Sequence, residues 1–156
     1  MGFFKSTKGS IISDYFKLAQ DVAQLKAGNM YDVSLYDDYL EVKAPAGSVK
    51  LKYDQITDVY YGLQTEIKEK SKSVIGRAAA GGLLFGGVGA IVGGISGTGS
   101  KDVKTKKFMF IISYRSSSGE DTFISFEDTR MYKGVKVANK LKELANIKGV
   151  EQGEYL

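Results

Sequence analysis

The chain has no cysteine, no histidine and no tryptophan, and only one of its 156 residues is proline. Without cysteine and histidine it cannot form disulfides, Ser-His-Asp or Cys-His triads, or the usual zinc sites. The N-terminal sequence MGFFKSTKGS becomes polar at Lys5, so it lacks the apolar core of a secretory signal. We therefore expect a cytoplasmic, non-catalytic protein without metal, cofactor or small-molecule substrate.

A strong excess of positive charge is also missing. The net charge of +4 is too small for a dedicated nucleic-acid-binding protein, and we expect no nucleic-acid partner. Carboxylates that sit close together in the sequence all fall at predicted turns or strand ends, where solvated acids and caps are common. They are Asp37 and Asp38, Asp54 and Asp58, Glu120 and Asp121, and Glu127 and Asp128. We interpret them as structural rather than as acid–base or Mg²⁺ sites.

Glycine, in contrast, is abundant, and most of the 19 glycines lie in the segment 74–99 (VIGRAAAGGLLFGGVGAIVGGISGTG). From Ala78 to Ile95 this segment carries no charged residue. Small residues recur at every fourth position, which on a helix makes a smooth ridge that another helix can approach closely. The ridge consists of Ala78, Gly82, Gly86, Ala90 and Gly94. The spacing predicts a glycine zipper.

The rest of the chain predicts an α+β domain. Helical spacing over 11–27 predicts an N-terminal helix, and we assign residues 1–29 to it. Apolar residues then alternate with polar ones, which predicts six strands near 31–35, 40–44, 49–53, 56–67, 107–115 and 121–126. An amphipathic pattern predicts a last helix over about 130–147, followed by a tail at 149–156. The antiparallel sheet is expected to curve into an open barrel that the C-terminal helix closes.

The glycine-rich segment interrupts this sheet. A single helix of 18 uncharged residues is roughly 27 Å long, barely enough to cross a bilayer. A single crossing would leave the two halves of one sheet on opposite sides of the membrane. We therefore predict a helical hairpin that bends near Gly86, with Phe85 and Val88 at its tip. Both flanks are basic, which suits two ends at one anionic membrane face. This collar comprises Lys68, Lys70, Lys72, Arg77, Lys101, Lys104, Lys106 and Lys107.

Two stretches carry a family resemblance. YDVSLYDDYLEVKAPAGSVKLKYDQITDVYYG, followed by FMFIISYRSSSGEDTFISFED and the terminal helix, resembles a bacterial pleckstrin-homology-like (PH-like) domain. IGRAAAGGLLFGGVGAIVGGISG resembles a segment that accompanies such domains in bacterial and phage proteins. The resemblance implies a PH-like domain over 30–148, split by the insertion at 74–99, although our count is one strand short of the family's seven. It also implies binding of proteins or lipids rather than catalysis.

These observations predict a non-catalytic PH-like adaptor whose glycine-zipper hairpin contacts a membrane, drives oligomerisation, or does both. Its partners would be the inner face of the membrane, further copies of itself, and a protein. The alternative is a soluble protein–protein interaction module. A phage or mobile element would encode it, it would bind a host or viral protein, and its glycine-rich segment would serve self-assembly. A plain glycine-rich loop is a third interpretation.

Overall fold

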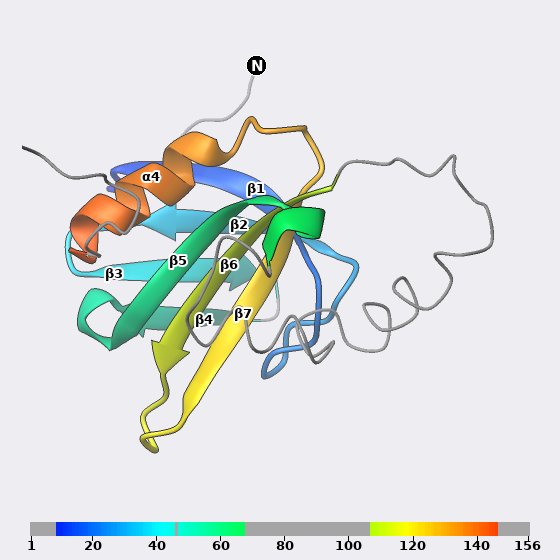
Figure 1. Ribbon diagram of the computed structural model, residues 1–156. Coiled ribbons are helices and arrows are strands. Elements are labelled where there is room, and N and C mark those ends of the chain that lie inside the picture. Colours follow the sequence, from blue (N-terminus) through cyan, green and yellow to red (C-terminus); the bar gives the residue numbers. More distant parts are fainter. Residues whose placement is uncertain (1–8, 46, 68–106, 147–156) are drawn as a thin grey trace, which may run out of the picture.

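The computed structural model describes residues 9–45, 47–67 and 107–146, which form seven strands and one α-helix. The strands are β1 (Ile12–Leu18), β2 (Met30–Leu35), β3 (Tyr39–Ala44), β4 (Gly47–Lys52), β5 (Ile56–Leu63), β6 (Phe108–Arg115) and β7 (Asp121–Asp128). The helix is α4 (Val135–Leu144), and two 3₁₀ turns, η1 (Tyr53–Gln55) and η2 (Gln64–Glu66), flank β5. Figure 1 shows their arrangement.

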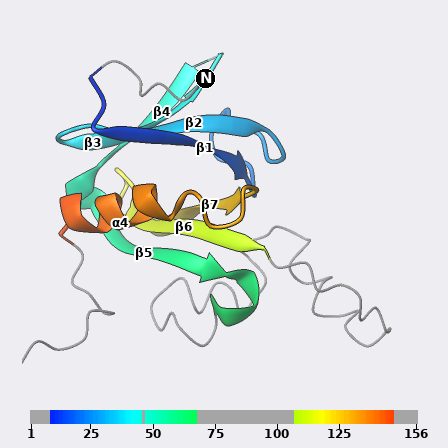
Figure 2. The same cartoon turned by 90° about the horizontal axis from the view of Figure 1, so that it is seen from above.

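All seven strands belong to one antiparallel sheet with the order β4-β3-β2-β1-β7-β6-β5. Strands β1 and β7 pair only through Lys17 with Glu127 and Leu18 with Phe126. The sheet bends at this short seam, so β1–β4 and β5–β7 face each other as two layers whose strands cross (Figures 1 and 2). The edge strands β4 and β5 do not pair with each other, so the sheet does not close into a barrel. The predicted α+β class and the curved, open antiparallel sheet are confirmed.

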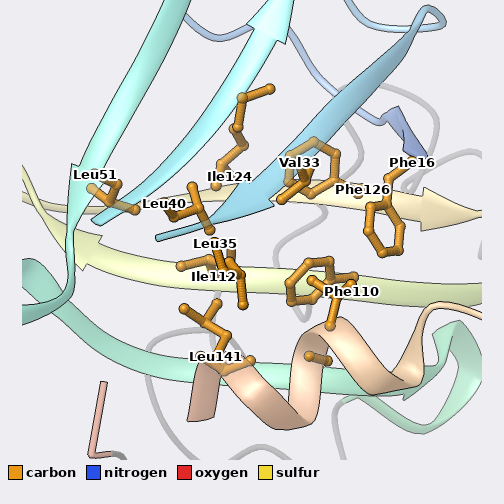
Figure 3. Packing of buried hydrophobic residues seen from close by; sticks show 14 of the residues in the cluster. Phe16, Val33, Leu35, Leu40, Leu51, Phe110, Ile112, Ile124, Phe126 and Leu141 are labelled. Carbon is orange, nitrogen blue, oxygen red and sulfur yellow. The ribbon is translucent and has the colours of Figure 1, made fainter. Parts of the chain in front are cut away.

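The main core fills the space between the two layers, where alternate residues of each strand point inward (Figure 3). Phe16, Phe110 and Phe126 pack with ring centroids 5.0–5.9 Å apart, and none is exposed. Helix α4 lies across one open end and inserts Val137, Ala138 and Leu141 into this core. Apolar burial of this kind is the main force that holds such a domain together.

A second, smaller cluster lies on the opposite face of β5 and β6. Tyr60, Ile67, Met109 and Ile111 form it, with Ala19 and Phe123 packed against them. Tyr60 and Ile111 are cross-strand partners, as are Gly62 and Met109. The sheet β5–β7 is therefore apolar on both faces.

The predicted N-terminal helix over 11–27 is wrong. Residues 12–18 form β1, and residues 19–29 form turns held by the bridge between Val22 and Leu25. Ala23 has φ 54°, which an α-helix does not allow. The segment is extended because Phe16 and Leu18 must both enter the core while Tyr15 faces out. β1 is the strand that the predicted count of six lacks, and it pairs with β2 on one side and with β7 on the other.

One smaller prediction also changes. Helix α4 begins at Val135, because a turn occupies residues 129–134. The pairing of β5 with β6 is irregular between Ile56 and Asp58. The predicted glycine-rich hairpin and the tail at 149–156 lie outside the described residues. In the part of the chain that is described, no helix is long and apolar enough to cross a membrane.

Candidate interaction site

Strand β5 ends and β6 begins at the same point of the sheet. Leu63 pairs with Phe108, and the backbone N–H of Gln64 donates to the carbonyl of Lys107 at 2.8 Å. The described parts of the chain before and after residues 68–106 are therefore held together at this point of the sheet. This confirms that the strands on either side of the glycine-rich segment belong to one sheet.

Most of the predicted site residues lie between Ile67 and Lys107 in the sequence. Outside the described residues are Ala78, Gly82, Phe85, Gly86, Val88, Ala90 and Gly94 of the zipper, and Lys68, Lys70, Lys72, Arg77, Lys101, Lys104 and Lys106 of the collar. Lys107 is the collar residue that the structure places. It is half-buried directly before β6, and its carbonyl accepts the Gln64 N–H.

Three aromatic side chains, which we call the aromatic cluster, surround this point: Tyr61, Phe108 and Tyr132. The ring of Tyr132 lies 5.2 Å from that of Phe108 and 5.7 Å from that of Tyr61, edge-on to the latter. Tyr61 and Phe108 are stacked at 6.1 Å. Such aromatic pairs contribute about 0.5–1.5 kcal/mol each beyond their buried area. The cluster thus ties the turn after β7 to the ends of β5 and β6.

The buried carboxylate of Asp128 shapes that turn. It accepts hydrogen bonds from the backbone N–H of Arg130 at 3.1 Å and of Gly134 at 2.5 Å, and from the hydroxyl of Tyr61 at 2.5 Å. Burial, and then the hydrogen bond to Asp128, raise the pKa of Tyr61 above its ordinary value, so its hydroxyl stays protonated and donating. Asp128 is therefore a turn-forming residue.

Arg130 balances the charge of the turn. Its Nη1 donates to Asp14 Oδ1 at 2.5 Å, its Nη2 lies 3.6 Å from Asp128 Oδ1, and its guanidinium lies over the ring of Phe16. Burial alone would lower the pKa of Arg130, but the two carboxylates raise it overall. The group stays a cation and holds β1 against the turn.

The tip of the same turn is apolar and exposed. Met131 is 59% exposed and Tyr132 54% exposed, and Lys133 beside them is also exposed. Both Met131 (φ 54°) and Tyr132 (φ 78°) have left-handed backbone conformations, which are rare outside glycine and asparagine. The arrangement presents two apolar side chains and a cation to solvent at a fixed position.

The acidic pairs that were interpreted as structural have varied surroundings. Asp37, Asp38 and Asp54 line a surface hollow of about 460 Å³ together with Tyr53 and Leu144. Asp121 forms an exposed ion pair with Arg115. Within residues 9–45, 47–67 and 107–146, no group of three or more acidic side chains is placed to hold a metal ion.

The sequence analysis did not predict the exposed tip because it placed residues 130–147 in one helix. Gly134 was the available signal, since glycine is a poor residue for a helix interior. The meeting of Tyr61, Phe108 and Tyr132 depends on the pairing of β5, β6 and β7 and is not visible in the sequence.

A bent seven-stranded antiparallel sheet with one C-terminal helix across its open end is the architecture of a PH-like domain. The model of the family described as glycine zipper containing PH domain matches residues 20–128, more than half of the chain. The protein belongs to this family. The match runs through both the strands β2–β7 and the segment 74–99. No curated protein and no solved structure matches the chain significantly.

Proposed function

We propose that this protein is a non-catalytic PH-like adaptor in which the segment 74–99 contacts a membrane, joins copies of the chain, or does both. The observation that carries the proposal is that the strands before and after the insertion are joined where β5 ends and β6 begins, with Gln64 N–H bonded to the Lys107 carbonyl. Membership of a glycine-zipper PH family supports the same reading of the segment.

The adjacency matters because it limits how the segment can meet a bilayer. A segment that starts and ends at one point of a folded sheet must return to the side it left. A hairpin in one leaflet satisfies this condition, and a single crossing does not. Basic residues on both flanks of 74–99 then lie at the same membrane surface. Attraction to anionic headgroups there contributes about 1 kcal/mol of binding free energy per lysine or arginine. The inner face of the membrane is the expected location.

A soluble protein-binding module is the second candidate, and one surface favours it. On the outer face of β2–β4, Tyr36 stacks on Tyr39 at 4.8 Å, and Lys50 lies 5.1 Å above the Tyr39 ring. Lys43 lies 5.8 Å from the Tyr36 ring. Tyrosine offers contact area at low entropic cost and is enriched at protein interfaces. In this candidate the glycine-rich segment serves self-assembly.

Vesicle sedimentation of the full chain, together with light scattering, tests the first proposal. The full chain should sediment with vesicles that contain phosphatidylglycerol, and G82L/G86L/G94L should reduce assembly size because leucine fills the small-residue ridge. K101Q/K104Q/K106Q should weaken vesicle binding. As a charge-matched control, K26Q/K50Q/K52Q removes three exposed lysines elsewhere on the domain and should leave vesicle binding nearly unchanged.

The two outcomes that count against the proposal are separate. A chain that stays in the supernatant with every vesicle composition has no membrane function. If the assembly keeps its size after the three leucine substitutions, the small-residue ridge does not join copies of the chain. If both results are found, the protein-binding surface around Tyr36 and Tyr39 becomes the better account.

A further inference from the structure

We propose that the turn 129–133 between β7 and α4 is a second membrane-contact element, in which Met131 and Tyr132 enter the interface of an anionic bilayer. The inference rests on the proposed membrane function and adds a contact made by the folded domain itself. It starts from the exposed fractions of these two side chains, 59% and 54%.

The exposure of Met131 and Tyr132 is built in by the fold. Both residues have positive φ, a conformation that persists only where the surrounding structure enforces it and that clusters at functional sites. The Asp128 carboxylate fixes the turn through its bonds to the N–H groups of Arg130 and Gly134. The ring of Tyr132 is braced on one side by Phe108. The domain thus accepts backbone strain while holding two apolar side chains in water.

The chemistry of the tip suits a lipid interface. A tyrosine has an apolar ring and a polar hydroxyl and is enriched at the headgroup level of membranes. Lys133 follows Tyr132 and is exposed, so a cation adjoins the apolar tip. Two apolar side chains are far fewer than the 20–30 residues a side of a typical stable protein interface. An anionic lipid surface is therefore the occupant that we infer.

The position of the turn supports the same occupant. Figure 1 shows the turn at the end of the sheet where β6 begins, and the Tyr132 and Phe108 rings are 5.2 Å apart. Phe108 directly follows Lys107, where the chain returns from the glycine-rich segment. If that segment enters a leaflet, this end of the domain faces the lipid, and the turn meets the surface without any rearrangement.

A single tryptophan reports the contact, because the full chain has none of its own. Tyr132→Trp places the fluorophore at the tip, and Ser117→Trp places it on the exposed turn at the opposite end of β6 and β7 (Figure 1). With phosphatidylglycerol-containing vesicles, emission from position 132 should shift to the blue and be quenched by brominated lipid. Emission from position 117 should not change.

A substitution pair measures the contribution to binding. M131N/Y132N removes both apolar side chains and introduces asparagine, which tolerates the left-handed conformation. It should weaken vesicle binding at least about tenfold, because one buried large apolar side chain corresponds to that factor or more. The matched control is Y15N/M30N, which removes a tyrosine and a methionine of similar exposure (45% and 47%) from the outer face of β1 and β2. Its binding should change less than about twofold.

Each result decides between outcomes. If the chain sediments with vesicles while position 132 stays unquenched, or while M131N/Y132N binds normally, the inference is overturned and the proposed function stands. Quenching at both 132 and 117 indicates general adsorption and also overturns it. If the unmodified chain does not sediment, both the inference and the membrane function fail. If M131N/Y132N forms smaller assemblies while its vesicle binding is unchanged, the tip contacts a second copy of the chain and not lipid.

Discussion

At the scale of single residues, the turn after β7 depends on one position that has no room for a side chain. A β-carbon built on Gly134 would lie 2.4 Å and 2.6 Å from two ring atoms of Phe16 and 2.7 Å from Asp128 Oδ2. The N–H of Gly134 also donates to the Asp128 carboxylate. Gly134 therefore sets the distance between the turn and β1, and with it the place of the exposed tip.

Gly134→Ala should lower the free energy of unfolding by about 2–3 kcal/mol, because Phe16 and Asp128 must both move. Urea unfolding followed by circular dichroism measures this. Gly119→Ala is the control: its φ is +92° but nothing lies within 4 Å of the added carbon, so a loss of about 1 kcal/mol from backbone strain is expected. Equal losses in the two variants would contradict the crowding of Gly134.

Buried tyrosines set the alkaline limit of the domain. Burial raises the pKa of Tyr53 and of Tyr60 to about 12, from an ordinary value of 10.0. The unfolded chain therefore loses these protons first, and the folded state binds more protons between pH 10 and pH 12. The stabilisation is fully present below pH 10 and is lost as the pH rises through that range. Denaturant midpoints should fall there, and Tyr60→Phe should make the fall less steep.

At the scale of elements, α4 stabilises the fold by covering one open end of the bent sheet. Its buried residues Val137, Ala138 and Leu141 lie on one face, and the exposed Asn139 lies on the other. The sheet stays open because its edge strands β4 and β5 do not pair with each other. The helix packs mainly against β5 and β1 and adds apolar contacts to the core at that end.

Leu141→Ala should therefore destabilise the domain by about 3 kcal/mol, as expected for a buried leucine replaced without collapse of the space. Asn139→Ala, on the opposite face of the same helix, should change the unfolding free energy by less than about 0.5 kcal/mol. Thermal and urea unfolding of both variants measure the difference. A loss in Leu141→Ala no larger than in Asn139→Ala would show that α4 is not part of the core.

At the scale of the whole molecule, the proposed membrane function combines two kinds of attraction. In this proposal the basic collar and Lys133 provide charge, and the glycine-rich segment and the tip of the turn provide apolar contact. Charge acts over a Debye length and is screened by salt, whereas close packing of a small-residue ridge is not. The two contributions can therefore be separated.

Raising salt from about 0.01 M to about 1 M shortens the Debye length from roughly 30 Å to 3 Å. Binding of the full chain to phosphatidylglycerol-containing vesicles should weaken strongly over this range, and assembly size by light scattering should stay constant. Vesicles of phosphatidylcholine alone serve as the control and should show weak binding at every salt concentration. Assembly that dissolves in step with vesicle binding would show that charge, not the zipper, joins the copies.

The strands β2–β7 and the C-terminal helix could be predicted from the sequence, because their core is built by simple alternation. Val33, Leu35, Leu40 and Val42 alternate with polar residues, and this pattern is meaningful without knowledge of the partner strand. The insertion within one sheet was predictable for the same reason. The zipper and most of the collar are visible as sequence patterns, and they remain predictions.

Only the tertiary structure decided β1 and the turn 129–134. Residues 12–18 contain apolar side chains at both helical and strand spacing, and pairing with β2 and β7 selects the strand because it buries Phe16 and Leu18 together. In the turn, Asp128 accepts a hydrogen bond from Gly134, while Phe16 and Asp14 of β1 contact the turn from distant positions in the chain. Together these contacts impose a backbone that local propensity disfavours. The exposed Met131 and Tyr132 follow from those long-range contacts, which no local pattern encodes.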